Sequence, residues 1–215
     1  DSGRASPTIA LPHLIRSSRK PSVVPGAAAS SHNATLHSST AHGFKSTPLA
    51  GTRVYDAVVF DNDGVLVTVP SLPVFREAAR RAFEGLGIDP DQEEVAAVSG
   101  AADPARVYEI CDRHGLDPDA FWRRRDREAA LAQREEVRAG RTRAYDDLDV
   151  VRSLDARTAI VSSNQHETIE FLLDHLDLRG AFDAYFGREH SMAGVERKKP
   201  GTHYLDLAMT AIDAD

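Results

Sequence analysis

Two carboxylates stand two positions apart in the sequence Asp61-Asn62-Asp63-Gly64, directly after the apolar run Val54 to Phe60. Carboxylates at this spacing can ligate a divalent cation, or supply a nucleophile and an acid–base group to a reaction. A calcium-binding loop would continue with oxygen ligands at alternating positions, whereas Leu66, Val67 and Val69 occupy this stretch. A surface turn is the other simple interpretation, but the preceding run is too apolar to end in a turn without a role.

A hydroxyl and an ammonium group complete the set of candidate reactive side chains. Ser162 follows the run Arg157 to Val161, and Lys199 precedes Pro200. A strand-end serine is often a helix cap and a Lys-Pro pair is often a surface turn, so neither signal is specific by itself. Lys198 stands beside Lys199, and we choose Lys199 because it directly precedes the proline. The candidate site residues are therefore Asp61, Asp63, Ser162 and Lys199.

The elements that must position these side chains alternate between strands and helices. Short apolar runs at 54–60, 157–161 and about 182–186 predict strands, and polar residues follow the first two. An apolar stripe after the second strand predicts one helix, and Pro200 is expected to open another that extends to Ile212. This alternation predicts an α/β fold with an open parallel sheet, whose site lies at the carboxyl ends of the strands.

About ninety residues separate the first two predicted strands, and they have the pattern of helices throughout. Helix starts are predicted at Pro73, Asp103 and Asp117, and the last of these helices extends toward Gly140. This segment is too long for a plain crossover between two strands. We therefore expect an α/β core formed by residues 51–69 and 141–215, with an inserted, all-helical cap at residues 70–140.

Composition limits the partners and the compartment. Residues 1–50 lack periodicity and are predicted to form a disordered leader, and the rest of the chain carries 32 acidic against 21 basic residues, a net charge of −11. Nucleic acid demands a basic face, so no nucleic-acid partner is expected. No run approaches the ~18 apolar residues that span a bilayer, so no membrane partner is expected either. The single cysteine, Cys111, is interpreted as buried filler and favours a cytoplasmic location, while the oligomeric state stays open.

The motifs in this order resemble those of the haloacid-dehalogenase superfamily. The stretch Ala57 to Leu66 is similar to its first motif, an apolar strand ending in Asp-x-Asp-Gly. The strand ending at Ser162 is similar to the second motif, and the pair Lys199-Pro200 is similar to the third. The resemblance covers residues 54 to about 212 and implies a Rossmann-like core with a helical cap between the first two motifs.

The resemblance implies a role for each candidate residue. Asp61 would attack phosphorus to give an aspartyl-phosphate, and Asp63 would protonate the leaving oxygen and then activate water. Ser162 would bind the transferred phosphoryl group and Lys199 would neutralise its charge. The cofactor would be Mg²⁺, held by the Asp61 carboxylate and the Asp63 backbone carbonyl. The second acid, Asp63, favours phosphoryl transfer over carbon–halogen cleavage, since a departing halide needs no proton.

Two departures from the family pattern bear on these expectations. Asn62 stands between the aspartates where an apolar residue is common, and it is expected to be tolerated because it would point away from the phosphate. A fourth motif with further metal-binding carboxylates is expected after the helix ending near Ile212, and the sequence stops at Asp215. The leading interpretation is a phosphatase acting on a small phosphorylated metabolite. A phosphomutase and a truncated, non-catalytic fragment are the alternatives.

No residue in the predicted cap identifies the substrate. Arg123, Arg124 and Arg125 could bind a substrate anion, but we interpret them as a solvated face of the third predicted helix. His166 lies close to the second motif and is interpreted as a surface residue of an early helical turn.

Overall fold

A parallel sheet of three strands forms the centre of the protein. The computed structural model describes residues 55–100 and 102–214, so the leader predicted at 1–50 lies outside the described residues. The strands are β1 (Ala57–Phe60), β2 (Arg157–Gln165) and β3 (Ala184–Arg188), in the order β1-β2-β3. Both pairings are parallel. The predicted α/β class with a parallel sheet is confirmed.

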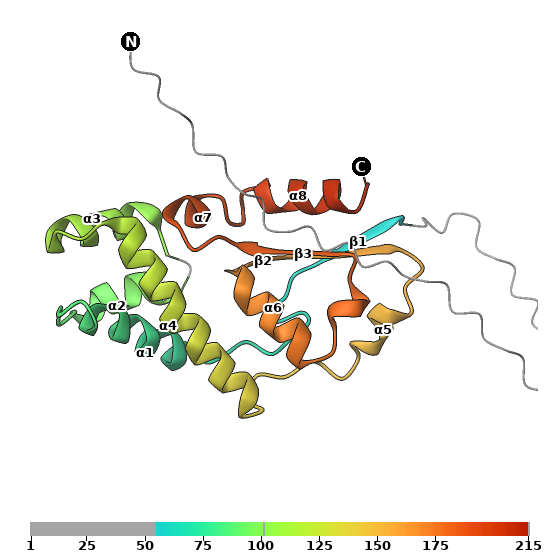
Figure 1. The fold of residues 1–215 in the computed structure, drawn as a ribbon, viewed down its shortest axis with the longest axis horizontal. Helices are drawn as coiled ribbons and strands as arrows, with labels where there is room; N and C mark the ends of the chain where they lie inside the picture. Colours follow the sequence, from blue (N-terminus) through green and yellow to red (C-terminus); the bar gives the residue numbers. More distant parts are fainter. Residues whose placement is uncertain (1–54, 101, 215) are drawn as a thin grey trace, which may run out of the picture.

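Helices lie on both faces of the sheet and at one end of it (Figure 1). They are α1 (Leu72–Glu84), α2 (Gln92–Ser99), α3 (Pro104–His114), α4 (Pro118–Arg138), α5 (Asp149–Arg152), α6 (His166–His175), α7 (Met192–Glu196) and α8 (His203–Ala211), with the 3-10 turn η1 (Arg179–Ala181). Helices α6 and α8 lie on opposite sides of the sheet, while α1 to α4 are grouped beyond one end (Figure 1).

Strand alternation explains why the sheet needs a helix on each face. Successive side chains of β2 point to opposite faces, so Ile160 packs with Ile169 and Leu172 of α6. Its neighbours Ala159 and Val161 pack with α8 residues on the other face. All three β2 side chains are buried. Burial on both faces is what the unbroken apolar runs of the sequence predict for a parallel sheet.

Helices α2 to α4 begin where the side chain of a capping residue accepts a hydrogen bond from a free backbone N–H group. Asp103 accepts a hydrogen bond from the N–H of Ala105, and Asp117 accepts one from that of Ala120, as predicted for these two starts. Helix α2, which we did not predict individually, begins with a capping box between Asp91 and Glu94.

The grouped helices share an apolar core that includes a helix from the far end of the sequence. Phe83, Phe121 and Trp122 are almost fully buried, and the unpaired Cys111 packs in the same cluster as the predicted filler. Met192 and Val195 of α7 belong to this cluster as well. The cap predicted at residues 70–140 therefore contacts α7 through apolar side chains, and the division into cap and core stays a prediction.

Several element boundaries differ from the predicted ones. Strand β1 begins at Ala57, whereas the predicted strand began at residue 54. Strand β2 continues to Gln165 instead of ending at Val161, with an irregular register between these residues. Strand β3 starts at Ala184, because Phe182 turns into the core cluster beneath the sheet. Helix α8 starts at His203, and Pro200 lies in the turn before it.

Among residues 55–100 and 102–214, no helix is both long enough and apolar enough to cross a membrane.

Candidate functional site

The structure brings all four predicted site residues together at the carboxyl ends of β1 and β2. Nζ of Lys199 lies 2.8 Å from Oδ1 of Asp61 and donates a hydrogen bond to the carbonyl of Val161 at 3.2 Å. The Ser162 hydroxyl lies 3.5 Å from Oδ2 of Asp63. The Asp61 side chain is 42% exposed. Its carboxylate therefore remains accessible to a ligand while it contacts Lys199.

A tight loop after β1 sets the spacing of the two carboxylates. The carbonyl of Asn62 accepts the N–H groups of Leu66 and Val67 at 2.9 and 3.1 Å. The N–H of Gly64 donates to the carbonyl of Val67 at 2.8 Å. Gly64 has a φ of +80°, a conformation that side chains rarely adopt, so a glycine is required at this turn.

Asn62 does more in this loop than the sequence indicated. Its side chain is 2% exposed, and its Nδ2 donates to Oδ1 of Asp63 at 3.0 Å. Its backbone N–H donates to Oδ1 of Asp61 at 2.8 Å. We expected Asn62 merely to be tolerated, whereas it contacts both carboxylates and fixes their orientation.

Asp63 is surrounded by amide and hydroxyl donors, yet burial has the largest effect on its pKa. Loss of solvent raises the pKa of Asp63, the hydrogen bonds from Asn164, Asn62 and Ser162 lower it in part, and the nearby Asp61 charge raises it further. The net pKa lies above the usual value for an aspartate. A raised pKa keeps the proton on the carboxyl to a higher pH, which suits a group that must donate one.

The structure separates the two neighbouring lysines. Lys198 donates from Nζ to the carbonyl of Ala102 at 2.6 Å, and partial burial lowers its pKa. Lys199 makes the contact with Asp61. The position chosen because it precedes Pro200 is therefore the one that faces the carboxylate.

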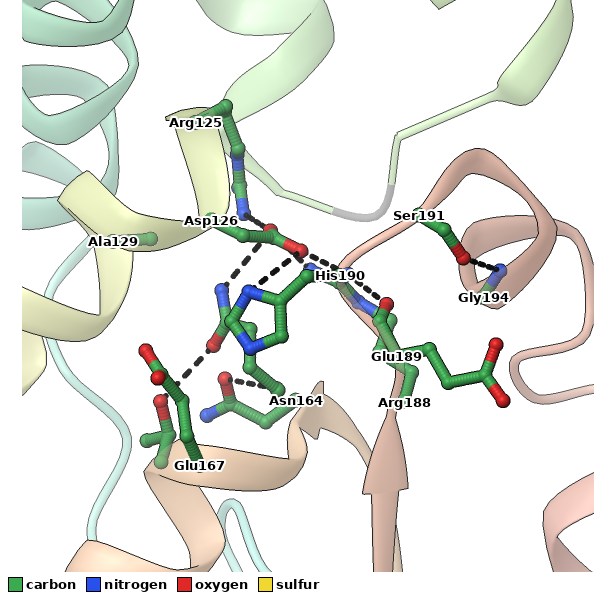
Figure 2. Close-up of polar contacts among 12 residues, drawn as sticks. Arg125, Asp126, Ala129, Asn164, Glu167, Arg188, Glu189, His190, Ser191 and Gly194 are labelled. Carbon is green, nitrogen blue, oxygen red and sulfur yellow. Dashed lines mark hydrogen bonds and ion pairs between the residues drawn. The ribbon is translucent and has the colours of Figure 1, made fainter. Parts of the chain in front are cut away.

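A buried polar layer, which sequence reasoning missed, lies between α4 and the ends of β2 and β3. Figure 2 shows the Asp126 carboxylate between Arg125 and Arg188. Arg188 donates to it at 2.5 and 2.6 Å and Arg125 at 3.1 Å. Although burial alone would raise it, these arginines hold the pKa of Asp126 below its usual value. Gln165 and Gln133 continue the layer toward Asn164.

The three consecutive arginines of α4 do not form one solvated face, so that interpretation is wrong. Arg125 is 4% exposed and donates to the carbonyls of Val98 and Ser99. Arg124 donates to the carbonyl of Ala82. Arg123 is exposed and lines a cavity of about 450 Å³. The helical period turns Arg125 into the core because it lies on the same stripe as Trp122 and Ala129.

His166 is half-buried instead of lying at the surface as expected. Its ring stacks on Tyr185 with centroids 5.3 Å apart, and its Nδ1 accepts the N–H of Gly187 at 3.2 Å. Burial lowers the pKa of His166. These contacts give it a structural role at the start of α6.

The carboxylates fit a magnesium ion that keeps much of its water. Among the described residues, no three His, Cys, Asp or Glu side chains lie together in an arrangement that could hold a metal ion. Mg²⁺ does not require such a cluster, because it is commonly bound by one or two carboxylates together with substrate phosphate oxygens and water. Burial is the main cause of the raised pKa of Asp63, and the negative charge of Asp61 adds to it. A hard cation beside both carboxylates would relieve this repulsion.

Solved structures of other proteins share the fold of this chain. A structure of CbbY from Rhodobacter sphaeroides, a variant in complex with xylulose-(1,5)-bisphosphate, is similar at a TM-score of 0.54 and 19% identity, covering 75% of this chain and 74% of that one. A candidate phosphoglycolate phosphatase from Lactobacillus plantarum is similar at a TM-score of 0.50 and 16% identity, covering 74% and 72%. Both likenesses show the shared fold.

A search of curated proteins finds no match. A family model described as haloacid dehalogenase-like hydrolase matches residues 55–212, which is most of the chain and contains all four candidate residues. The chain therefore belongs to the haloacid dehalogenase-like hydrolase family.

Proposed function

We propose that the protein hydrolyses phosphate monoesters through nucleophilic attack by Asp61 on phosphorus. The observation that carries the proposal is the contact between the Lys199 ammonium group and Asp61, at 2.8 Å. An anionic carboxylate approaches an anionic phosphoryl group only when nearby positive charge offsets their repulsion, and Lys199 supplies one such charge. The partial exposure of Asp61 leaves room for the substrate.

The two carboxylates divide the chemistry between them. A carboxylate oxygen of Asp61 forms the new bond to phosphorus while the bond from phosphorus to the ester oxygen breaks. Asp63 gives its proton to that departing oxygen, then takes a proton from the water that attacks the aspartyl-phosphate. Inorganic phosphate leaves and both carboxyl groups return to their initial states. The raised pKa of Asp63 supports its part as the proton donor.

The remaining candidates bind and orient the phosphoryl group. The Ser162 hydroxyl, which lies at the end of the apolar part of β2, would donate to one phosphoryl oxygen. We propose Mg²⁺ as cofactor, held by the Asp61 carboxylate and the Asp63 carbonyl. When bound, the ion would neutralise charge on the transferring group.

Small phosphorylated metabolites are the proposed substrate class. The similar CbbY structure was solved with xylulose bisphosphate, which is a compound of this kind. Helices α1 to α4, within the proposed cap at residues 70–140, would cover the substrate, and residues 51–69 and 141–215 would form the core. We further propose a cytoplasmic location, which the single unpaired Cys111 supports.

Exchanging Asp63 for asparagine tests its role as the acid. The Asp63→Asn variant should lose about 10²–10⁴ in kcat for alkyl phosphates, because the leaving alkoxide needs a proton. The loss should be smaller for p-nitrophenyl phosphate, whose leaving group needs little protonation. The measurement is kcat over a series of esters, using the protein expressed from its complete coding sequence. Equal losses across the series would rule out proton donation by Asp63.

The two adjacent lysines offer a matched pair of variants. Lys199→Met should lower kcat by about 10²-fold or more, since it removes a charge aimed at the reacting group. Lys198→Met removes the same charge one residue away, where Nζ contacts the carbonyl of Ala102. It should retain nearly full activity. Similar losses in both variants would show that general stability, and not the contact with Asp61, explains the effect.

A further inference from the structure

We propose that Gln133 and Asn164 form a positioning pair that holds the Asp63 carboxyl group in place for proton donation. The inference rests on the proposed function, because it concerns the acid of that reaction. Gln133 lies on α4 and Asn164 on β2, so the pair joins the grouped helices to the sheet beside the site.

The side-chain amides of the two residues bind each other in both directions. Nδ2 of Asn164 donates to Oε1 of Gln133 at 2.7 Å, and Nε2 of Gln133 lies 3.2 Å from Oδ1 of Asn164. Nδ2 of Asn164 also faces the Asp63 carboxyl, at 3.4 Å from Oδ1 and 3.3 Å from Oδ2. The same amino group thus contacts both Gln133 and the proposed acid.

These contacts leave Asn164 a single favourable amide orientation. Its Oδ1 accepts the backbone N–H of Gln165 at 2.9 Å in addition to Nε2 of Gln133. A flip of the amide would lose both bonds and would turn an oxygen toward the Asp63 carboxyl. The amino group is therefore held toward Asp63, and it restricts where that carboxyl can lie.

Gln133 is itself held firmly enough to act as a support. Its side chain is 3% exposed, and its Nε2 also lies 3.3 Å from the carbonyl of Ala129 and 3.2 Å from Oε1 of Gln165. Gln165 is anchored in turn by Thr168 and Asp126. A buried, fully bonded support of this kind fixes the group that touches it far better than a solvated one does.

The pair couples α4 to the acid. Movement of α4 away from β2 would separate Gln133 from Asn164 and release the restraint on Asp63. Proton donation at full rate therefore requires that α4 is docked on the sheet.

The test replaces Gln133 by methionine, which nearly keeps the volume and removes both the carbonyl oxygen and the amino group of the side-chain amide. For Gln133→Met, kcat for alkyl phosphates should fall about tenfold, while kcat for p-nitrophenyl phosphate should fall less than about twofold. KM should stay unchanged for both esters, because substrate binding is not affected. A merely structural role would lower both rates by the same factor.

Thr158→Val is the control, since it removes a buried side-chain hydrogen bond of β2, the one from Thr158 to the carbonyl of Ala181, without removing a contact to Gln133 or Asn164. It should destabilise the fold to a similar degree and leave the ratio of the two rates unchanged. Asn164→Ala is the second variant, and should show the same selective loss for alkyl phosphates if Gln133→Met does not fold. In the Asp63→Asn background, neither Gln133→Met nor Asn164→Ala should further change the ratio of kcat for alkyl phosphates to kcat for p-nitrophenyl phosphate.

Three results separate the possible failures. A uniform loss in Gln133→Met and Asn164→Ala, with an active wild-type protein that depends on Asp61, would overturn the positioning pair alone. A selective loss of the same size in the control Thr158→Val would also overturn it. A wild-type protein without activity on any phosphate ester would instead contradict the proposed function, and the pair with it.

Discussion

Replacing Asp61 by asparagine is expected to lower kcat for p-nitrophenyl phosphate at least about a thousandfold, because an amide cannot attack phosphorus as a carboxylate does. The change is nearly isosteric, and the side chain is 42% exposed, so the fold should be retained. The measurements are the initial rate with p-nitrophenyl phosphate and the circular dichroism spectrum of the folded protein.

Asp56→Asn is the matched control for this variant. Asp56 lies one residue before β1 and is exposed, at the other end of the strand from Asp61. The same chemical change there should leave the rate nearly unaltered. If the wild-type protein is active and Asp61→Asn keeps more than a few percent of its activity, Asp61 is not the nucleophile.

Asp126→Asn is expected to cost about 3–5 kcal/mol of unfolding free energy, because it leaves two buried guanidinium groups without a counter-charge. Asp126 is fully buried, and the side chains of Arg125 and Arg188 are each 5% exposed. Asparagine keeps the size of the side chain and one acceptor oxygen, so the loss reports charge more than volume. The measurement is a urea unfolding curve compared with that of the wild type.

Asp174→Asn provides the comparison at the surface. Asp174 lies 2.5 Å from Arg179, with side chains 60% and 33% exposed. Solvent screens such a pair, so its loss should cost less than about 1 kcal/mol. Equal costs for the two variants would show that the buried layer contributes no more than a surface ion pair.

The sequence was sufficient to find the residues that belong to strand ends. Asp61, Asp63 and Ser162 follow apolar runs, and parallel strands end at the same edge of a sheet, so their meeting could be expected. Lys199 could be chosen over Lys198 because it precedes Pro200. In the structure, Lys199 is the lysine that contacts Asp61.

The supporting residues could not be found in the same way. The second predicted strand ends at Val161, but β2 continues to Gln165 and carries the Asn164 amide into the site. Gln133 and Arg125 lie within a helix whose sequence is mostly charged, and burial there depends on which stripe faces the core. Their signal was present, since Trp122, Ala129 and Val137 share that stripe at helical spacing. Polar residues on an apolar stripe of this kind indicate a buried network.

The sequence predicts the extent of α4 but not the residues that it contacts. The helix start at Asp117 and its extension toward Gly140 are predicted by the capping residues and the helical pattern of the segment, and the helix spans Pro118–Arg138. Which partners the helix would bury could not be predicted, because Arg188 and Gln165 lie far along the chain and meet α4 only through the folded sheet.

The proposed nucleophile can be tested most directly by trapping the phosphorylated protein. A substrate with a radiolabelled phosphoryl group is mixed with the protein expressed from its complete coding sequence, and the reaction is quenched in acid, in which an acyl phosphate persists. We predict label on the peptide that contains Asp61, its release by hydroxylamine, and its absence in Asp61→Asn. Label on a different residue, or undiminished ester hydrolysis by Asp61→Asn, would contradict the account.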